Sequence, residues 1–295
     1  MAPPFADRLA ALVAERRSQV CLGLDPDPSG LEPRSRSGAT PAEAAAEAVV
    51  DHCRSLITAT APACVAVKPQ LACFERLGWA GWRALEQVIA AARDAGLLVV
   101  ADGKRGDVPV TAKVYAQSLF GSVETPWGEA AGLGADAATV NPLTGADALE
   151  PLLAAAERTG AGLFALVRTS NPGAADVLDL ATADGPLHEH LARMIAERAP
   201  RLAGSSGLSG MGAVVGATEP RHLGRLRALM PDSIFLIPGV GAQGGSAASL
   251  GPAFSADPAS VLVPASRSIA NADEPAAAAE DLRDQVWAAS QSAAR

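Results

Sequence analysis

The feature that most constrains the fold is a repeated alternation of short apolar runs with longer segments of helical spacing. Each apolar run is followed by a turn and then by an amphipathic or alanine-rich stretch. Strands that alternate with helices in this way form a parallel sheet with helices packed on its faces. The predicted strands are residues 20–24, 64–67, 97–101, 137–140, 163–167, 213–216, 234–237 and 261–263.

Eight strands with about eight intervening helices predict an α/β protein of the (β/α)8, or TIM-barrel, class. The chain has 295 residues, so we expect one barrel domain over residues 1–295, with terminal helices at about 5–17 and 275–290. We expect loops at 31–38 and 203–210. The rival fold is a doubly wound open sheet, but no G-x-G-x-x-G motif follows the first strand, which weakens a dinucleotide-binding interpretation.

Composition argues against several classes of function. The formal net charge of −8 and the aromatic content of 4% disfavour binding to nucleic acid or to an anionic membrane. The sequence contains no run of transmembrane length and no signal-peptide pattern, so we expect a cytoplasmic protein. The cysteines contain no C-x-x-C pair and are expected to be buried, reduced thiols: Cys21, Cys53, Cys64 and Cys73.

Residues 97–115, LLVVADGKRGDVPVTAKVY, concentrate charge at the end of the third predicted strand. Four aliphatic residues are followed directly by Asp102, Lys104 and Asp107. Side chains alternate along a strand, so Asp102 and Lys104 share a face. In a parallel α/β protein, this end of the strand holds ligands and catalytic groups. A solvated strand–loop junction with a structural ion pair would give the same pattern.

Polar residues also follow most of the other predicted strands, and the carboxyl ends of barrel strands converge on one mouth. The last two strand ends carry a candidate phosphate site. A glycine-rich loop, residues 239–245 (GVGAQGG), can approach an anion with its backbone N–H groups, and Ser266 and Arg267 follow the next strand. The other converging residues are Asp25, Lys68, Asn141, Ser170 and Gln243.

The histidines and carboxylates do not suggest a metal centre. Asp102 and Asp107 could in principle bind Mg²⁺, but Lys104 lies between them and would repel it. His188 and His190 are two residues apart and do not share a helix face as a metal pair would. We expect all four histidines to lie on solvated surface: His52, His188, His190 and His222.

These motifs resemble those of the orotidine 5′-phosphate decarboxylases, specifically the longer bacterial type 2 group. The similarity runs from near residue 20 to near residue 270. Asp-x-Lys-x-x-Asp is shared with related sugar-phosphate barrels, whereas the RTSNPG and PGVGAQGG segments narrow the match. The matching stretches are CLGLDPDP (21–28), VKPQLACFERLG (67–78), ADGKRGDVPVTAKVYA (101–116), TVNPLTGAD (139–147), VRTSNPGAADVLDL (167–180), GAVVGAT (212–218), FLIPGVGAQGG (235–245) and Ser266-Arg267.

The resemblance implies a carboxy-lyase that converts orotidine 5′-phosphate to uridine 5′-phosphate and CO2, the last step of de novo pyrimidine synthesis. It implies no cofactor and no metal. It also implies a homodimer in which Asp107 and Thr111 reach into the partner's site. Lys104 would donate the proton to C6 within an alternating array of Lys68, Asp102, Lys104 and Asp107.

The resemblance also implies how the substrate is held. Asp25 and Lys68 would bind the ribose hydroxyls, Ser170 would contact the pyrimidine edge, and Gln243 and Arg267 would bind the 5′-phosphate, with Asn141 and Ser266 also in the site. The chain departs from the family at Gly103, where alanine is usual, and at Pro109, where a small residue is usual.

Two alternative functions remain open from the sequence. One is a Mg²⁺-dependent decarboxylase or aldolase of the same barrel superfamily that acts on a sugar phosphate. The other is a barrel that binds a nucleotide without turning it over. We expect loss of activity with a chelator in the first case, and nucleotide binding without turnover in the second.

Overall fold

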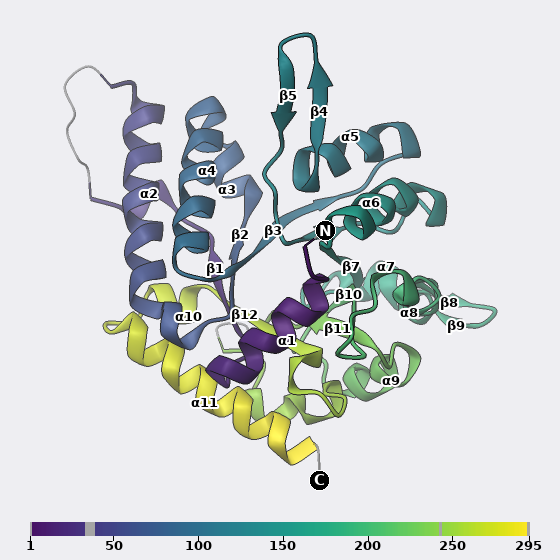
Figure 1. Cartoon of the computed structure of the whole chain (residues 1–295). Helices are drawn as coiled ribbons and strands as arrows, with labels where there is room; N and C mark the ends of the chain where they lie inside the picture. Colours follow the sequence, from purple (N-terminus) through teal and green to yellow (C-terminus); the bar gives the residue numbers. More distant parts are fainter. Residues whose placement is uncertain (1, 33–38, 242–243, 294–295) are drawn as a thin grey trace.

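The computed structural model describes residues 2–32, 39–241 and 244–293. Within these ranges, eight parallel strands close into a barrel in which each strand pairs with the next one along the chain, and the last pairs with the first (Figure 1). The TIM-barrel prediction is therefore confirmed. The barrel strands are β1 (Val20–Leu24), β2 (Ala66–Pro69), β3 (Leu98–Arg105), β6 (Ala137–Val140), β7 (Gly162–Arg168), β10 (Ser209–Val215), β11 (Ser233–Leu236) and β12 (Val261–Ala265).

Helices surround the barrel and bury their apolar faces against it (Figure 1). A capping box begins α2, because Thr40 accepts from the Glu43 N–H and the Glu43 carboxylate accepts from the Thr40 N–H at 2.8 Å. The helices are α1 (Phe5–Arg16), α2 (Pro41–Thr60), α3 (Leu71–Glu75), α4 (Gly78–Asp94), α5 (Pro109–Phe120), α6 (Ala146–Thr159), α7 (Ala174–Leu178), α8 (Leu187–Ala196), α9 (Arg221–Leu229), α10 (Arg267–Ala270) and α11 (Pro275–Ala293).

One end of the barrel is closed by α1. Phe5 packs edge-to-face on Phe164 of β7, with the ring centroids 5.8 Å apart. Gly162 begins β7 and makes room for this contact, because a Cβ atom there would lie 2.6 Å from the Phe5 ring. Arg8 of α1 also pairs with Asp136, which directly precedes β6. The amino-terminal end of the barrel is therefore sealed, and the carboxyl end is left for a site.

The structure differs from the sequence prediction in the stretch 203–210. We expected a loop there, but β10 begins at Ser209 and is buried throughout. Gly212 supports close packing here, because a Cβ atom at this position would lie 2.3 Å from the Ile234 carbonyl oxygen. Glycine in this strand therefore reflects the approach of neighbouring strands.

Two antiparallel hairpins were not predicted. One consists of β4 (Ser122–Thr125) and β5 (Gly128–Ala131), and it projects away from the barrel beside α5 (Figure 1). Its tip residue Trp127 is 92% exposed. The other is a short pair, β8 (Ala181–Thr182) and β9 (Gly185–Pro186). Neither hairpin belongs to the barrel, and both lie in connections between barrel strands.

Candidate active site

The centre of the site is Asp102, which β3 carries into the barrel mouth. On the β2 side the register is regular, and Asp102 pairs with Gln70. On the β6 side the register is broken, because Ala101 pairs with Ala138 but Arg105 pairs with Val140. Between these pairs β3 spans four residues and β6 only two. The extra residues form a bulge that contains Asp102 and Lys104. This bulge aims both side chains into one cavity.

The Asp102 carboxylate accepts hydrogen bonds from four side chains. Its Oδ1 accepts from Lys104 Nζ at 2.6 Å and from the Thr139 hydroxyl at 2.7 Å. Its Oδ2 accepts from Lys68 Nζ at 2.5 Å and from Gln70 Nε2 at 3.3 Å. An ionised carboxylate offers about four acceptor positions. All of them are occupied, so Asp102 is fixed between two ammonium groups.

The charges of this cluster stabilise one another. Burial by itself raises the pKa of Asp102, but attraction to Lys68 and Lys104 and their hydrogen bonds outweigh burial, and the pKa falls to about 2. Burial also acts to lower the pKa of Lys68, but Asp102 and the more distant Asp25 prevail and raise it. Asp102 and Lys68 are therefore both ionised at neutral pH. The cluster provides one buried cation, one buried anion, and one ammonium whose side chain is 44% exposed to the cavity.

Other predicted residues line the same cavity, which has a volume of about 500 Å³. Asp25 lies at the end of β1, with its Oδ1 3.9 Å from Lys68 Nζ. Arg267 begins α10 directly after β12, the neighbour of β1, and its guanidinium makes no hydrogen bond or ion pair with any residue in the described ranges. Such an unpaired guanidinium is suited to bind an anion bidentately. Ser170 and Ser266 complete the predicted set in this cavity.

Three predicted residues do not line the cavity of this chain. Asp107 lies on the rim, where its carboxylate accepts from the Val108 N–H at 2.7 Å, and Thr111 lies in the first turn of α5. Asn141 forms a turn instead, because its side chain accepts from the Leu143 N–H at 3.0 Å. The predicted residue Gln243 lies outside the described residues.

The loop that carries Ser170 is held by a partly buried ion pair that the sequence did not reveal. Arg168 ends β7 and binds Asp179 with two hydrogen bonds of 2.8 and 3.0 Å, while also donating to the Thr169 carbonyl. His188 lies against the same carboxylate at 3.1 Å. The loop also passes very close to Gly216, where a Cβ atom would lie 2.7 Å from the Ser170 Cα.

The expectation that all four histidines lie on solvated surface is wrong. His188 is buried and its Nδ1 lies 2.9 Å from the Leu178 carbonyl oxygen. It also packs edge-to-face on the half-buried His222, with ring centroids 4.8 Å apart. His52 is half-buried as well, and His190 is the one exposed ring in this set. The His188–His222 contact joins α8 and α9, and none of the four histidines lines the cavity.

The cysteine prediction holds for three of the four thiols. Cys21, Cys53 and Cys64 are buried and Cys73 is half-buried, and all four are free thiols. Burial raises the pKa of Cys53 and Cys64 to about 12, so neither is a reactive thiolate.

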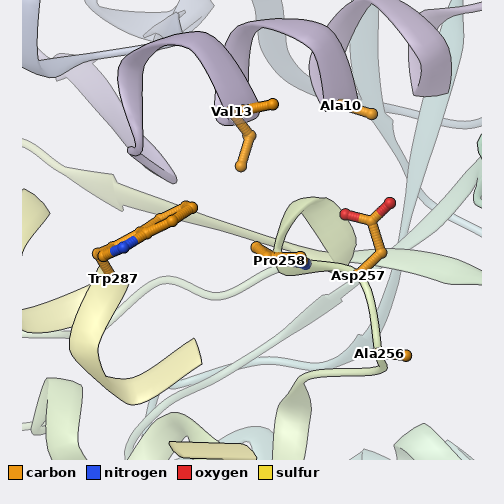
Figure 2. Close-up of a pocket in the computed structure, with 7 residues that line it drawn as sticks. Ala10, Val13, Ala256, Asp257, Pro258 and Trp287 are labelled. Atoms are coloured by element: carbon orange, nitrogen blue, oxygen red, sulfur yellow. The ribbon is translucent and has the colours of Figure 1, made fainter. Parts of the chain in front are cut away.

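A second groove, of about 450 Å³, lies at the closed end of the barrel between α1 and α11 (Figure 2). Trp287 lies beneath Val13, and the Asp257 carboxylate points toward α1. That carboxylate accepts from the Ala259 N–H at 2.7 Å and so caps a short 3-10 helix. The groove carries a single acidic group with a structural role, in contrast to the charged cavity at the barrel mouth.

No group of three or more histidine, cysteine or acidic side chains in the described part of the chain is arranged to hold a metal ion. Within the same ranges, no helix is long and apolar enough to cross a membrane.

Comparison with known proteins shows the family to which this chain belongs. The model of the "Orotidine 5'-phosphate decarboxylase / HUMPS family" matches residues 18–282. The orotidine 5′-phosphate decarboxylase of Rhodopirellula baltica is 41% identical over 270 residues, covering 90% of this chain and 87% of that protein. That of Haloarcula marismortui is 42% identical over 94% of this chain and 90% of its own length.

A solved structure agrees with the sequence relatives. The structure of Leishmania donovani OMP decarboxylase superposes with a TM-score of 0.76 at 36% identity, covering 98% of this chain and 99% of that one. Matches of this extent, together with a charged cavity at the mouth of a closed barrel, identify the family. The chain belongs to the orotidine 5′-phosphate decarboxylase / HUMPS family.

Proposed function

We propose that this chain decarboxylates orotidine 5′-phosphate to uridine 5′-phosphate and CO2, and that Lys104 protonates C6. The names of its relatives support the reaction. The observation that carries the assignment of Lys104 is its ammonium, held 2.6 Å from Asp102 and partly exposed to the cavity. A cation fixed in this way needs no reorganisation before the reaction begins.

The chemistry explains why such an ammonium is needed. Loss of CO2 from C6 leaves an electron pair in an sp² orbital that the ring π system cannot absorb. Catalysis therefore requires groups that stabilise negative charge at C6 more strongly in the transition state than in the bound substrate. Lys104 would stabilise that charge and then transfer a proton from Nζ to C6. Asp102 would keep the ammonium charged and oriented near the departing carboxylate.

The rest of the cavity would hold the nucleotide. We assign Asp25 and Lys68 to the ribose hydroxyls and Ser170 to the pyrimidine edge. Arg267 would bind the 5′-phosphate, with help from Ser266. Binding energy from the phosphate, which is remote from C6, can be used to orient the reacting part of the substrate.

The Mg²⁺-dependent alternative is not favoured by the geometry of Asp102. Its four acceptor positions are filled by donors, and two of those donors are ammonium groups that would repel a divalent cation. The non-catalytic alternative is disfavoured because a site that only binds nucleotide has no need of two lysines against one buried carboxylate.

We also propose a homodimer that shares residues between sites. Asp107 and Thr111 lie on the rim of the barrel, and three valines around them are exposed: Val108, Val110 and Val114. Exposed apolar side chains that cluster in this way are typical of protein interfaces. A second copy seated there would bury the valines and bring Asp107 toward the neighbouring cavity.

The reduced thiols support the expected cytoplasmic location.

The decisive test is a spectrophotometric decarboxylation assay on metal-free protein. We expect the wild type to turn over orotidine 5′-phosphate, and Lys104→Ala to lose activity by many powers of ten while still binding the product nucleotide. A Lys104→Ala variant with a tenth of wild-type activity would remove Lys104 from this role.

The shared site can be tested by mixing two inactive variants. In a heterodimer of Lys104→Ala with Asp107→Ala, one site carries both lesions and the other carries neither. Random exchange should therefore restore about a quarter of wild-type activity. Mixtures that stay inactive although the subunits exchange would contradict the contribution of Asp107 in trans.

A further inference from the structure

Thr139 is a buried residue of β6 that contacts both Asp102 and Lys104. Its side chain faces the cavity, and the residue is only 1% exposed. Its hydroxyl oxygen lies 2.7 Å from Asp102 Oδ1 and 2.9 Å from the backbone nitrogen of Lys104. We infer that Thr139 is a positioning residue that fixes the Lys104 ammonium through its backbone and through Asp102. This inference rests on the proposed role of Lys104.

The strand register explains why a side chain is needed at this place. In a regular parallel ladder, backbone groups of β3 would pair with those of β6. The bulge between Ala101 and Arg105 interrupts that pairing, and the ladder resumes where the Asn141 N–H donates to the Arg105 carbonyl at 2.8 Å. A backbone N–H inside the bulge would otherwise have no strand partner. The Thr139 hydroxyl takes the place of that partner for Lys104.

The direction of both hydrogen bonds follows from elementary chemistry. A backbone N–H can only donate, so the Thr139 oxygen accepts from Lys104. The single hydroxyl proton is then available for Asp102, which is ionised and can only accept. Each partner therefore fixes the hydroxyl in one orientation. Substitution by valine would keep the shape of the side chain and remove both hydrogen bonds.

The backbone of Lys104 shows what this arrangement restrains. Its φ angle is +46°, in the left-handed region that residues with a Cβ atom seldom adopt. Such a conformation persists only where the surroundings enforce it. The Thr139 hydroxyl holds the nitrogen of this residue, and Asp102 holds its ammonium. The three residues form a closed ring of hydrogen bonds, which leaves the lysine little freedom to swing within the cavity.

Loss of this ring should impair the chemical step more than binding. Thr139 is remote from Arg267, which would bind the phosphate, so nucleotide affinity should change little. Displacement of a reacting group by about 1 Å can cost about 100-fold in rate. We therefore expect Thr139→Val to lower kcat by about this factor and to leave KM within about two-fold of wild type.

Two further variants separate positioning from packing. Thr139→Ser keeps the hydroxyl and should recover most of the lost kcat. Thr60→Val is the matched control, because Thr60 is equally buried in α2, its hydroxyl donates to the Leu56 carbonyl at 2.9 Å, and it does not line the cavity. This control should keep wild-type kcat. If Thr139→Val does not fold, Thr139→Cys retains only a weak donor and should show the same selective loss of kcat.

The result is read from kcat, KM and the affinity for uridine 5′-phosphate, measured on wild type and on each variant. A Thr139→Val variant with kcat within two-fold of wild type would overturn the inference. Equal losses in Thr139→Val and Thr139→Ser would overturn it as well. Failure of the proposed function would look different, because the wild type itself would not turn over orotidine 5′-phosphate, or Lys104→Ala would remain active.

Discussion

Replacing Asp102 by asparagine should destabilise the protein strongly, because the site is built around one buried anion. All four side chains that contact this carboxylate are donors. An asparagine amide has only one acceptor oxygen, and its NH2 group would face either Lys68 and Gln70 or Lys104 and Thr139. At least one pair of donors would then lose its acceptor.

The size of the stability loss in Asp102→Asn depends mainly on Lys68. The Lys68 side chain is 9% exposed, so its ammonium cannot relax into water, whereas Lys104 can. Breaking a buried pair by removing one partner costs about 3–5 kcal/mol of unfolding free energy, and we expect this loss in Asp102→Asn at pH 7. The Asp25 carboxylate is too distant, at 3.9 Å from Lys68 Nζ, to replace Asp102 fully.

The pH dependence provides a second signature. In the wild type, the pKa of Asp102 is depressed from 3.8 to about 2, so its contribution of about 2 kcal/mol is present above pH 4 and is lost as the pH falls through 2. The pKa of Lys68 is raised above 10.5, so wild-type stability falls in strong alkali. In Asp102→Asn, burial without a partner should lower the pKa of Lys68 below its ordinary value of 10.5. The free energy of unfolding of this variant should therefore rise as the pH increases toward 10.5.

Urea unfolding across the pH range measures both effects. The control is the double variant Lys68→Met/Asp102→Asn, which removes the buried ammonium together with its partner and should regain much of the lost stability. A loss below about 1 kcal/mol in Asp102→Asn at pH 7 would refute this reasoning. A double variant no more stable than the single one would refute it equally.

Other substitutions test the walls of the cavity and its surroundings. Arg267→Ala should weaken binding of uridine 5′-phosphate by about 10- to 100-fold, and equal weakening with uridine in titration calorimetry would contradict a phosphate contact. Gly216→Ala should displace the loop that carries Ser170, since the new Cβ would lie 2.7 Å from its Cα, and a crystal structure with an unmoved loop would contradict this. Arg227 donates to five carbonyl oxygens, and its guanidinium lies 3.8 Å from the Phe235 ring centroid. Arg227→Met should therefore lower the free energy of unfolding, measured in urea, by about 3 kcal/mol or more and leave kcat unchanged.

The barrel was predictable because each strand shows a strong local signal. Short aliphatic runs, each followed by helical spacing, fixed the element order without tertiary information. The start of β10 was missed because Ser209, Gly210 and Gly212 are typical loop residues, and only the closeness of Ile234 shows why glycine is needed. The hairpin of β4 and β5 was missed because its strands are exposed and lack an alternating apolar pattern.

The charged array was predictable and its supporting contacts were not. Asp102 and Lys104 stand out because charge follows directly after an apolar strand. Thr139 gives no such signal, because a threonine inside an apolar run is typical of any strand. Its role depends on the bulge in the neighbouring strand, which local sequence does not reveal. His188 was misjudged because the sequence does not reveal that Asp179 and Leu178 would fold over it.

The seal that α1 forms across the barrel floor also determines where the molecule can be attached to something else. Both α1 and α11 border the groove next to the residues that precede β12 (Figure 2). This groove lies at the amino-terminal end of the barrel, whereas the cavity lies at the carboxyl ends of the strands. A purification tag, a fluorophore or a solid support joined to α1, or to α11 near Trp287, would therefore lie beneath the barrel, away from the path by which nucleotides enter and CO2 leaves. In protein immobilised in this way, the cavity at the carboxyl end of the barrel should stay open to solvent.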